Sequence, residues 1–198
     1  HDLFSPVEPW TIRIIKFAEE LQKKGHVVRI AYFPLKSAGS KFIHGVEVTP
    51  LERRITPITM IKNINYLVLS AQWADIIHFQ KSHFYAALPS LLAAYIVGKP
   101  VHYDWDDWEE EIFYASVQKK TLTSVLTGFS FYLLERCLPF LVDSVSVSSE
   151  ELRLLALKRG VNVDRVFWTP VGADLEIFKD EVDAHLIRDR YQLNSDIL

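Results

Sequence analysis

The chain has 198 residues, of which 49% are apolar, and this is enough for one folded domain with a large core. Its formal net charge is only −3, without a block of like charges, which argues against nucleic acid as a partner because phosphate binding needs a concentrated basic face. Cys137 is the only cysteine, which excludes an intrachain disulfide and a cysteine-rich zinc cluster and favours a reducing, cytoplasmic compartment.

The first third of the chain alternates helical and strand patterns. Residues 10–24 place apolar side chains on one helical face, and Gly25 is placed to end that helix. The next predicted elements are a strand at 27–33, a short strand at 46–48 and a helix at 58–73. A doubly wound fold normally opens with a strand, whereas this chain opens with a loop and a helix. We therefore expect a first central strand before His1.

The rest of the chain repeats strand and helix at regular spacing. We predict strands at 76–79, 101–105, 142–147 and 166–169, with helices between them that end at Gly98, at 138 and at 159. This order implies right-handed crossovers and a doubly wound, mostly parallel Rossmann-like α/β sheet. Pro89 must kink its helix or mark the first turn. The helix at 119–138 is apolar on most of its surface and is expected to be buried.

Residues 1–174 are expected to form this domain. Residues 175–198 have the pattern of a linker, a polar helix at 184–191 and the first residues of a second domain. The stretch 122–134 carries no charge but is shorter than the roughly 20 residues that a membrane-spanning helix needs.

An acidic segment follows the predicted strand at 101–105, at the end of the strand where open α/β sheets bind ligands. Three carboxylates within four residues repel one another, so at least one needs a raised pKa, a partner or solvent. They could orient sugar hydroxyls, act as a base or bind a divalent cation, and a solvated acidic loop is the alternative. Aromatic side chains beside carboxylates favour sugar recognition. The residues of the segment are Tyr103, Asp104, Trp105, Asp106, Asp107 and Trp108.

Two histidines and a serine pair are further candidates. His78 is expected to line the same crevice as Asp104, whereas a hydrogen-bonded loop histidine is the default interpretation of His83. The sequence shows no further ligands at a spacing that would complete a zinc site. Ser148 is predicted to cap the helix that starts near Glu150, in a capping box with Glu151, and a ligand contact at this helix N-terminus is compatible with the cap.

Two nucleotide-binding motifs are absent from the sequence. None of the seven glycines forms a G-x-G pair, so the dinucleotide fingerprint is not present. The pattern G-x-x-x-x-G-K-[ST] is also missing, which excludes a P-loop nucleotidase.

Five segments, in the right order, resemble the N-terminal domain of GT-B-fold glycosyltransferases of family 4, the retaining group 1 type. They cover most of the chain. The segments are residues 10–33, 74–78 (ADIIH), 98–107 (GKPVHYDWDD), 146–150 (SVSSE) and 169–174 (TPVGAD) with Phe178.

The resemblance implies two Rossmann-like domains that face a cleft. The N-terminal domain would bind the acceptor (a sugar, lipid or polysaccharide), and a C-terminal domain outside these residues would bind the nucleotide-sugar donor. Transfer would retain the anomeric configuration without a cofactor or a metal ion. Asp104, Asp106 and Asp107 would be the catalytic residues. Binding residues at the rim would be His78, His83, Tyr103, Trp105, Trp108, Ser148, Ser149 and Glu150, the loop near the cleft would contain Pro6, Val7 and Glu8, and the hinge would contain Gly172 and Asp174.

Three positions depart from the family pattern. Asp106 stands where many members place a histidine that contacts the donor sugar, and Val171 replaces an asparagine. The loop at residues 5–9 has no glycine, which puts close backbone approach to a phosphate or sugar in doubt. Either the site is adapted to an unusual substrate, or it has lost part of its catalytic competence.

Two other functions remain open. The chain could be a non-catalytic binding or anchoring subunit that pairs with a separate donor domain, with the helix at 119–140 docking a partner or the inner face of a membrane. A receiver-type domain would need a lysine at a later strand end, which residues 142–148 do not offer. As an acceptor domain, the chain alone is not expected to transfer sugar efficiently.

Overall fold

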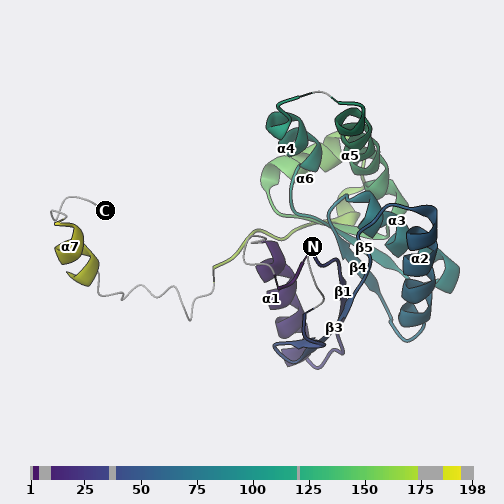
Figure 1. The fold of residues 1–198 in the computed structure, drawn as a ribbon, viewed down its shortest axis with the longest axis horizontal. Helices are drawn as coiled ribbons and strands as arrows, with labels where there is room; N and C mark the ends of the chain where they lie inside the picture. The colour runs from purple at the N-terminus through teal and green to yellow at the C-terminus, as the bar shows by residue number, and fades with distance from the viewer. Residues whose placement is uncertain (1, 5–9, 36–38, 120, 174–184, 193–198) are drawn as a thin grey trace.

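The computed structural model describes residues 2–4, 10–35, 39–119, 121–173 and 185–192 (Figure 1). The predicted strands and helices are present, with ends that shift by a few residues, and the strand at 101–105 is confirmed without change. The sequence patterns missed β2 and α4. The elements are α1 (Trp10–Lys23), β1 (Arg29–Tyr32), β2 (Phe42–Ile43), β3 (Val46–Pro50), α2 (Pro57–Ala71), β4 (Ile77–Gln80), α3 (Phe84–Val97), β5 (Val101–Trp105), α4 (Glu109–Ser116), α5 (Leu122–Leu141), β6 (Ser144–Val147), α6 (Glu150–Lys158), η1 (Val163–Arg165), β7 (Val166–Trp168) and α7 (His185–Tyr191).

The strands form two sheets. The first has the order β1-β3-β2, in which β1 and β3 are parallel and β2 is antiparallel to β3. The second has the order β4-β5-β6-β7 and is parallel throughout. This parallel sheet, with helices in its crossovers, confirms the Rossmann-like α/β class. β1 and β4 are outer strands of their sheets, and the first central strand expected before α1 stays a prediction.

The main core lies on one face of the parallel sheet. Alternate residues of β5, namely Val101, Tyr103 and Trp105, are at most 1% exposed and pack with Leu91 of α3 and Leu138 of α5. Because side chains alternate across a strand, the residues between them face the other side of the sheet. That opposite face is polar: His102 and Asp104 of β5 lie there beside Ser144 and Ser146 of β6.

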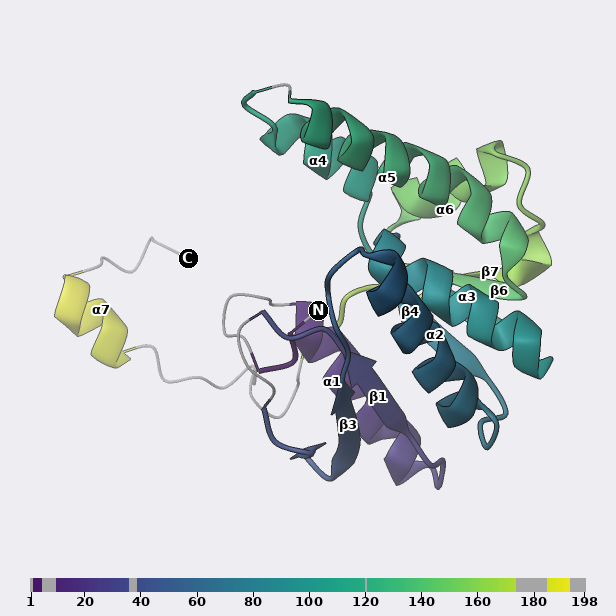
Figure 2. The ribbon, with the colours of Figure 1, turned by 45° about the vertical axis from the view of Figure 1, so that its right-hand side comes forward.

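A smaller cluster holds α1 on the first sheet. Ile15 of α1 shares it with Tyr32 of β1 and Val48 of β3. Figures 1 and 2 both show α1 beside these strands. α1 ends at Lys23, and Gly25 follows with a φ of 89°, a left-handed backbone conformation that glycine adopts without the steric cost of a Cβ.

One proline and one helix need comment. Pro89 lies inside α3, which rules out the first-turn alternative and leaves that of a proline within the helix. α5 is not buried as a whole: Phe131, Glu135 and Leu138 face inward, whereas most of its other large apolar side chains are exposed. The prediction from composition was wrong because α5 is apolar on two faces and only one of them packs on the domain. Among the described residues, none of the helices is long and apolar enough to cross a membrane.

Candidate functional site at the carboxyl end of the parallel sheet

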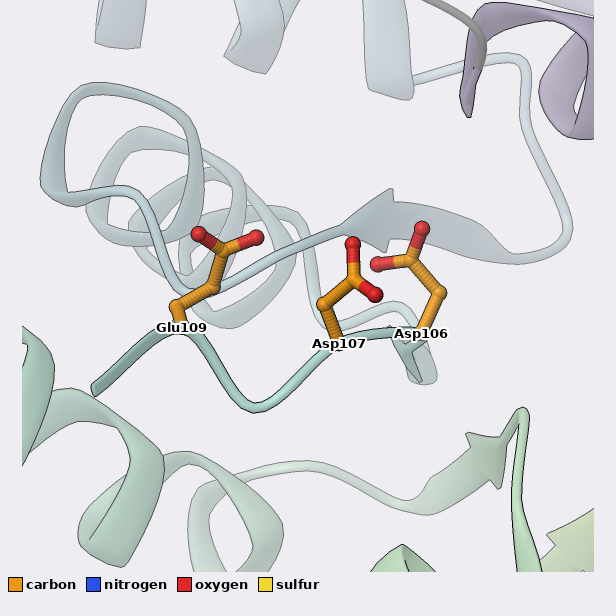
Figure 3. A group of neighbouring side chains, drawn as sticks. All are labelled: Asp106, Asp107 and Glu109. Atoms are coloured by element: carbon orange, nitrogen blue, oxygen red, sulfur yellow. The ribbon is translucent and has the colours of Figure 1, made fainter. Parts of the chain in front are cut away.

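The acidic segment after β5 forms a tight group of carboxylates. β5 ends at Trp105, and α4 begins at Glu109 with three glutamates in its first turn, where negative charge is favoured by the helix dipole. Oxygen atoms of Asp106, Asp107 and Glu109 lie within 4.8 Å of one another (Figure 3). The predicted proximity of Asp106 and Asp107 is thus present, and Glu109 joins them.

A buried lysine lies among these carboxylates. Lys81 directly follows β4, with a φ of 68°, and its backbone amide donates to the carbonyl of Asp104 over 3.1 Å. Its Nζ atom donates to Glu109 Oε1 (2.6 Å) and to Asp107, and lies 3.4 Å from Asp106 Oδ1. The side chain is only 3% exposed. Burial opposes its charged form, but Asp106 and Glu109 outweigh this cost and raise the pKa of Lys81.

Lys81 bears directly on metal binding. Carboxylate oxygens are the ligands that Mg²⁺ and Ca²⁺ prefer, so the group could hold a divalent cation by its chemistry. The ammonium group of Lys81 already contacts all three carboxylates, and its positive charge opposes a second cation there. The sequence reasoning missed Lys81, although its place two residues after the predicted strand at 76–79 was a usable signal.

Asp106 is the most perturbed of the three acids. Burial raises its pKa to about 7 against the opposing effect of Lys81, and the neighbouring charges of Asp107 and Asp104 raise it further. Its Oδ2 atom accepts a hydrogen bond from Gln80 Nε2 (2.8 Å), whereas Oδ1 accepts none from the described residues. Asp106 can therefore exchange a proton near neutral pH. Asp107, whose side chain is 40% exposed, is the carboxylate most open to solvent.

Asp104 belongs to a different arrangement. Arg13 of α1 donates to both of its carboxylate oxygens over 2.9 Å, and Ser146 donates to Oδ1 over 2.6 Å. Burial opposes ionisation, but the hydrogen bonds from Arg13 and Ser146 lower the pKa of Asp104. Arg13 also donates to the carbonyl of Thr169 over 3.0 Å, so this ion pair links α1 to β5 and to the residue after β7. Asp104 thus carries a structural bridge, and no pattern near it in the sequence pointed to Arg13.

Glu135 supports the acidic segment from behind. It projects from α5, is fully buried, and accepts a hydrogen bond from the backbone amide of Glu109 over 2.7 Å. Burial raises its pKa to about 7, although the amide bonds from Glu109 and Glu110 act in the opposite direction. Glu135 therefore holds the first turn of α4 and, through it, the carboxylate of Glu109. Sequence reasoning missed it within an otherwise apolar helix.

The predicted aromatic residues divide into two kinds. Tyr103 and Trp105 are fully buried in the core and stacked with a centroid separation of 6.2 Å, so neither ring faces solvent. Their assignment to the rim was wrong in position, because strand alternation turns them away from Asp104. Trp108 precedes α4 and packs partly on the core, and of the three it alone stays near the rim.

The histidines are not at the carboxylate group. His78 is exposed on the polar sheet face, and its ring lies 4.9 Å from that of His102. His102 contacts Ser144 Oγ (2.7 Å) and Ser146 Oγ (3.0 Å). Burial, together with His78, lowers the pKa of His102 to about 4. His83 precedes α3 and stacks on Tyr85, and burial with the charge of Lys81 lowers its pKa to about 3.

The serine pair, Ser148 and Ser149, lies close to the acidic segment, but the helix cap and the contact to that segment come from the opposite serines to those predicted. Ser149, not Ser148, caps α6, accepting from the amide of Leu152 over 3.2 Å. Ser148 donates to the backbone carbonyl of Asp106 and so fixes the loop. Glu150 forms an ion pair with Arg153 over 3.0 Å on the first turn of α6.

The remaining predicted positions lie away from this group or outside the described residues. Gly172 is exposed in the segment after β7. Pro6, Val7 and Glu8 of the predicted cleft loop and Asp174 of the predicted hinge are outside the described ranges. Their proposed roles stay predictions.

A hollow lies at the carboxyl ends of the other sheet's parallel strands. Its volume is about 600 Å³. Arg53 lies there and donates to the hydroxyl of Tyr85 at the start of α3 over 3.2 Å. The hollow has apolar and charged walls, formed by Pro34, Leu35, Pro50, Leu51, Glu52, Arg53 and Arg54.

Comparison with known proteins places the fold. No family model and no curated protein sequence matches the chain. Its structure is similar to the crystal structure of a glycosyltransferase from Rickettsia africae ESF-5, with a TM-score of 0.60 and 13% sequence identity. The match covers 98% of this chain and 48% of that one, so the chain spans about half the length of that glycosyltransferase. At this identity the likeness shows a shared fold.

Proposed function

We propose that the chain is the acceptor-binding half of a glycosyltransferase that moves a sugar from a nucleotide-sugar donor to an acceptor with retention. The observation that carries this proposal is the Lys81–Asp106–Asp107–Glu109 group at the carboxyl end of a parallel sheet. The fold that presents it resembles about half of a solved glycosyltransferase. Ligands of open α/β sheets bind at this end of the strands.

In this proposal Asp106 and Asp107 contact the transferred sugar. Asp107 is open enough to accept hydrogen bonds from sugar hydroxyls. Asp106, with a pKa of about 7, both accepts and returns a proton at neutral pH, which is the property of a general acid–base group. Lys81 supplies positive charge among the acids, so the proposal includes neither a metal ion nor a cofactor.

The hollow beside Arg53 is the proposed seat of the acceptor. Its apolar wall, with Leu35 and Leu51, suits a sugar ring or a lipid, and Arg53 and Arg54 suit an acidic group on the acceptor. The donor site, in turn, is proposed to lie in a second domain, with Gly172 and Asp174 near the hinge. The chain's coverage of 48% of the similar glycosyltransferase supports this division.

The test is sugar transfer by the full-length gene product with a panel of nucleotide-sugars. Asp106→Asn should lower kcat by about 10²–10⁴-fold, the range for loss of an acid–base group. The matched control is Asp164→Asn at an exposed position in η1, which should leave kcat unchanged. Equal rates for Asp106→Asn and the parent protein would remove Asp106 from the site.

The proposal that the donor site lies in a second domain has a separate test. The isolated 198-residue chain should give little transfer with any of these donors. Robust turnover by the isolated chain would contradict a donor site in a second domain. A full-length product that binds acceptor but never transfers sugar would favour the non-catalytic binding function instead.

A further inference from the structure

An apolar band runs along the outer face of α5. We define it by Leu122, Val125, Leu126, Phe129, Tyr132, Leu133 and Phe140, whose exposed fractions range from 43% to 78%. At 3.6 residues per turn these positions fall within roughly 120° of the helix circumference. The band is therefore as wide as the apolar face that normally packs on a core. Arg136 interrupts it between Leu133 and Phe140, with its guanidinium over the Tyr132 ring, 3.6 Å from the centroid.

The hairpin that carries this band has an unusual charge distribution. Between Ile112 and Leu134 the sequence contains no aspartate or glutamate, and its only charged residues are Lys119 and Lys120, which come between α4 and α5 in the sequence. The whole chain is nevertheless acidic, with a net charge of −3. An apolar surface is thus combined with two lysines, while three of the hairpin's four glutamates, Glu109, Glu110 and Glu135, are bonded within the domain.

The opposite face of α5 fixes how the band can be used. Phe131 and Leu138 are buried, and Glu135 accepts from the amide of Glu109 over 2.7 Å. At the far end of the band, Arg136 pairs with Glu110 over 2.6 Å. The helix is thereby held against α4 and the core between Phe131 and Leu138. The band can meet a surface lengthwise without α5 leaving the domain.

We propose that the α4–α5 hairpin docks flat on an anionic lipid surface. Interfacial helices bury an apolar face in the headgroup region and gain further affinity from lysines near anionic lipids. The tyrosine and phenylalanine rings of the band suit this boundary between apolar and polar surroundings. A second copy of the chain is the less suitable occupant, because its own hairpin offers the same lysines against one exposed acid, Glu111, among the described residues.

Vesicle co-sedimentation tests the proposal. The chain should bind vesicles of phosphatidylcholine mixed with phosphatidylglycerol, and high salt should weaken the binding. Lys119→Ser with Lys120→Ser should reduce the partition coefficient roughly 30-fold, as expected for two basic residues near the surface. Vesicles of phosphatidylcholine alone should respond little to this change.

The apolar contribution has a separate variant and a matched control. Phe129→Ser should reduce binding to either vesicle type about tenfold or more, because one large side chain no longer leaves water. Ile61→Ser on α2 removes a side chain of similar exposure, 58% against 56%, from a helix outside the hairpin. It should bind as the parent does, and circular dichroism should show the same helix content in all variants.

Three outcomes would overturn the proposal. The first is failure of the folded parent chain to bind anionic vesicles. The second is equal loss of binding in Ile61→Ser and Phe129→Ser. The third is a dimer in light scattering that Phe129→Ser abolishes, which would assign the band to a second copy.

Discussion

Asp104 and Asp106 are two residues apart on the same strand end, yet they face opposite electrostatic surroundings. Asp104 meets a guanidinium that donates to both of its oxygens, and its pKa is lowered. Asp106 shares one ammonium with two other acids, and its pKa is raised to about 7. Burial is nearly the same, 1% and 9% exposure. The number and geometry of charge partners, rather than burial, therefore decide which acid is structural and which can exchange a proton.

The largest expected effect on stability comes from breaking the ion pair between Arg13 and Asp104. Arg13→Ala should reduce the free energy of unfolding by about 3–5 kcal/mol, because it leaves a buried carboxylate without its main charge partner. Urea unfolding measures this loss. Lys23→Ala, which removes an exposed pair with Glu20, is the control and should change stability by less than about 0.5 kcal/mol. A loss under about 1 kcal/mol for Arg13→Ala would show that the bridge is not structural.

The raised pKa of Asp106 predicts a pH dependence of the folding stability, with an effect of intermediate size. Asp106 and Glu135 each have a higher pKa in the folded protein, about 7, than their ordinary values of 3.8 and 4.5. The folded state therefore binds more protons, and the stability that each contributes is present at low pH and lost as pH rises to about 7. Relative to the parent, Asp106→Asn and Glu135→Gln should each gain on the order of 2 kcal/mol of stability between pH 5 and 7.5.

The comparison with the parent matters because other groups act in the same window. His83 and His102, with pKa values lowered to about 3 and about 4, contribute stability that rises with pH up to their ordinary value of 6.5. Asp104, with its lowered pKa, loses its contribution only at still lower pH. If the stability of Asp106→Asn instead runs parallel to that of the parent across this pH range, the carboxyl group of Asp106 does not have a raised pKa.

The smallest expected effect concerns the serine pair beside Asp106. Ser149→Ala should cost about 1 kcal/mol through loss of the α6 cap, and Ser149→Asp should retain the cap and most of the stability. Ser148→Ala should also cost about 1 kcal/mol, but Ser148→Asp should not restore it, because the lost bond needs a donor to the Asp106 carbonyl. Thermal unfolding of the four variants separates the two roles. Rescue by aspartate at residue 148 instead of 149 would reverse the assignment.

The fold was predictable where local pattern and packing agree. β5 and β6 alternate apolar and polar residues, and they form the centre of the parallel sheet with their apolar residues in the core. β2 has two residues and α4 begins with three glutamates, so neither gives a period long enough to detect. The burial of α5 was misjudged because apolar composition does not say which of two apolar faces meets the core.

The acidic residues of the site could be predicted from the sequence, whereas its basic residues could not. Asp106 and Asp107 are adjacent in sequence, whereas Lys81 and Arg13 lie 26 and 91 residues from their partners Asp107 and Asp104. Contacts over such separations depend on strand order and on which face each side chain occupies. The burial of Tyr103 and Trp105 could have been inferred, since alternation along Val101–Trp105 puts them on one face and Asp104 on the other.

The most direct test of this account is a carbon-13 NMR titration of the aspartate carboxyl groups in the folded chain. The Asp106 signal should titrate near pH 7, and the Asp104 signal should titrate below the ordinary value of 3.8. Lys81→Met should move the Asp106 midpoint upward, because a neighbouring positive charge is lost. An Asp106 midpoint near 4, the ordinary value for an aspartate, would contradict the contrast on which the proposed site depends.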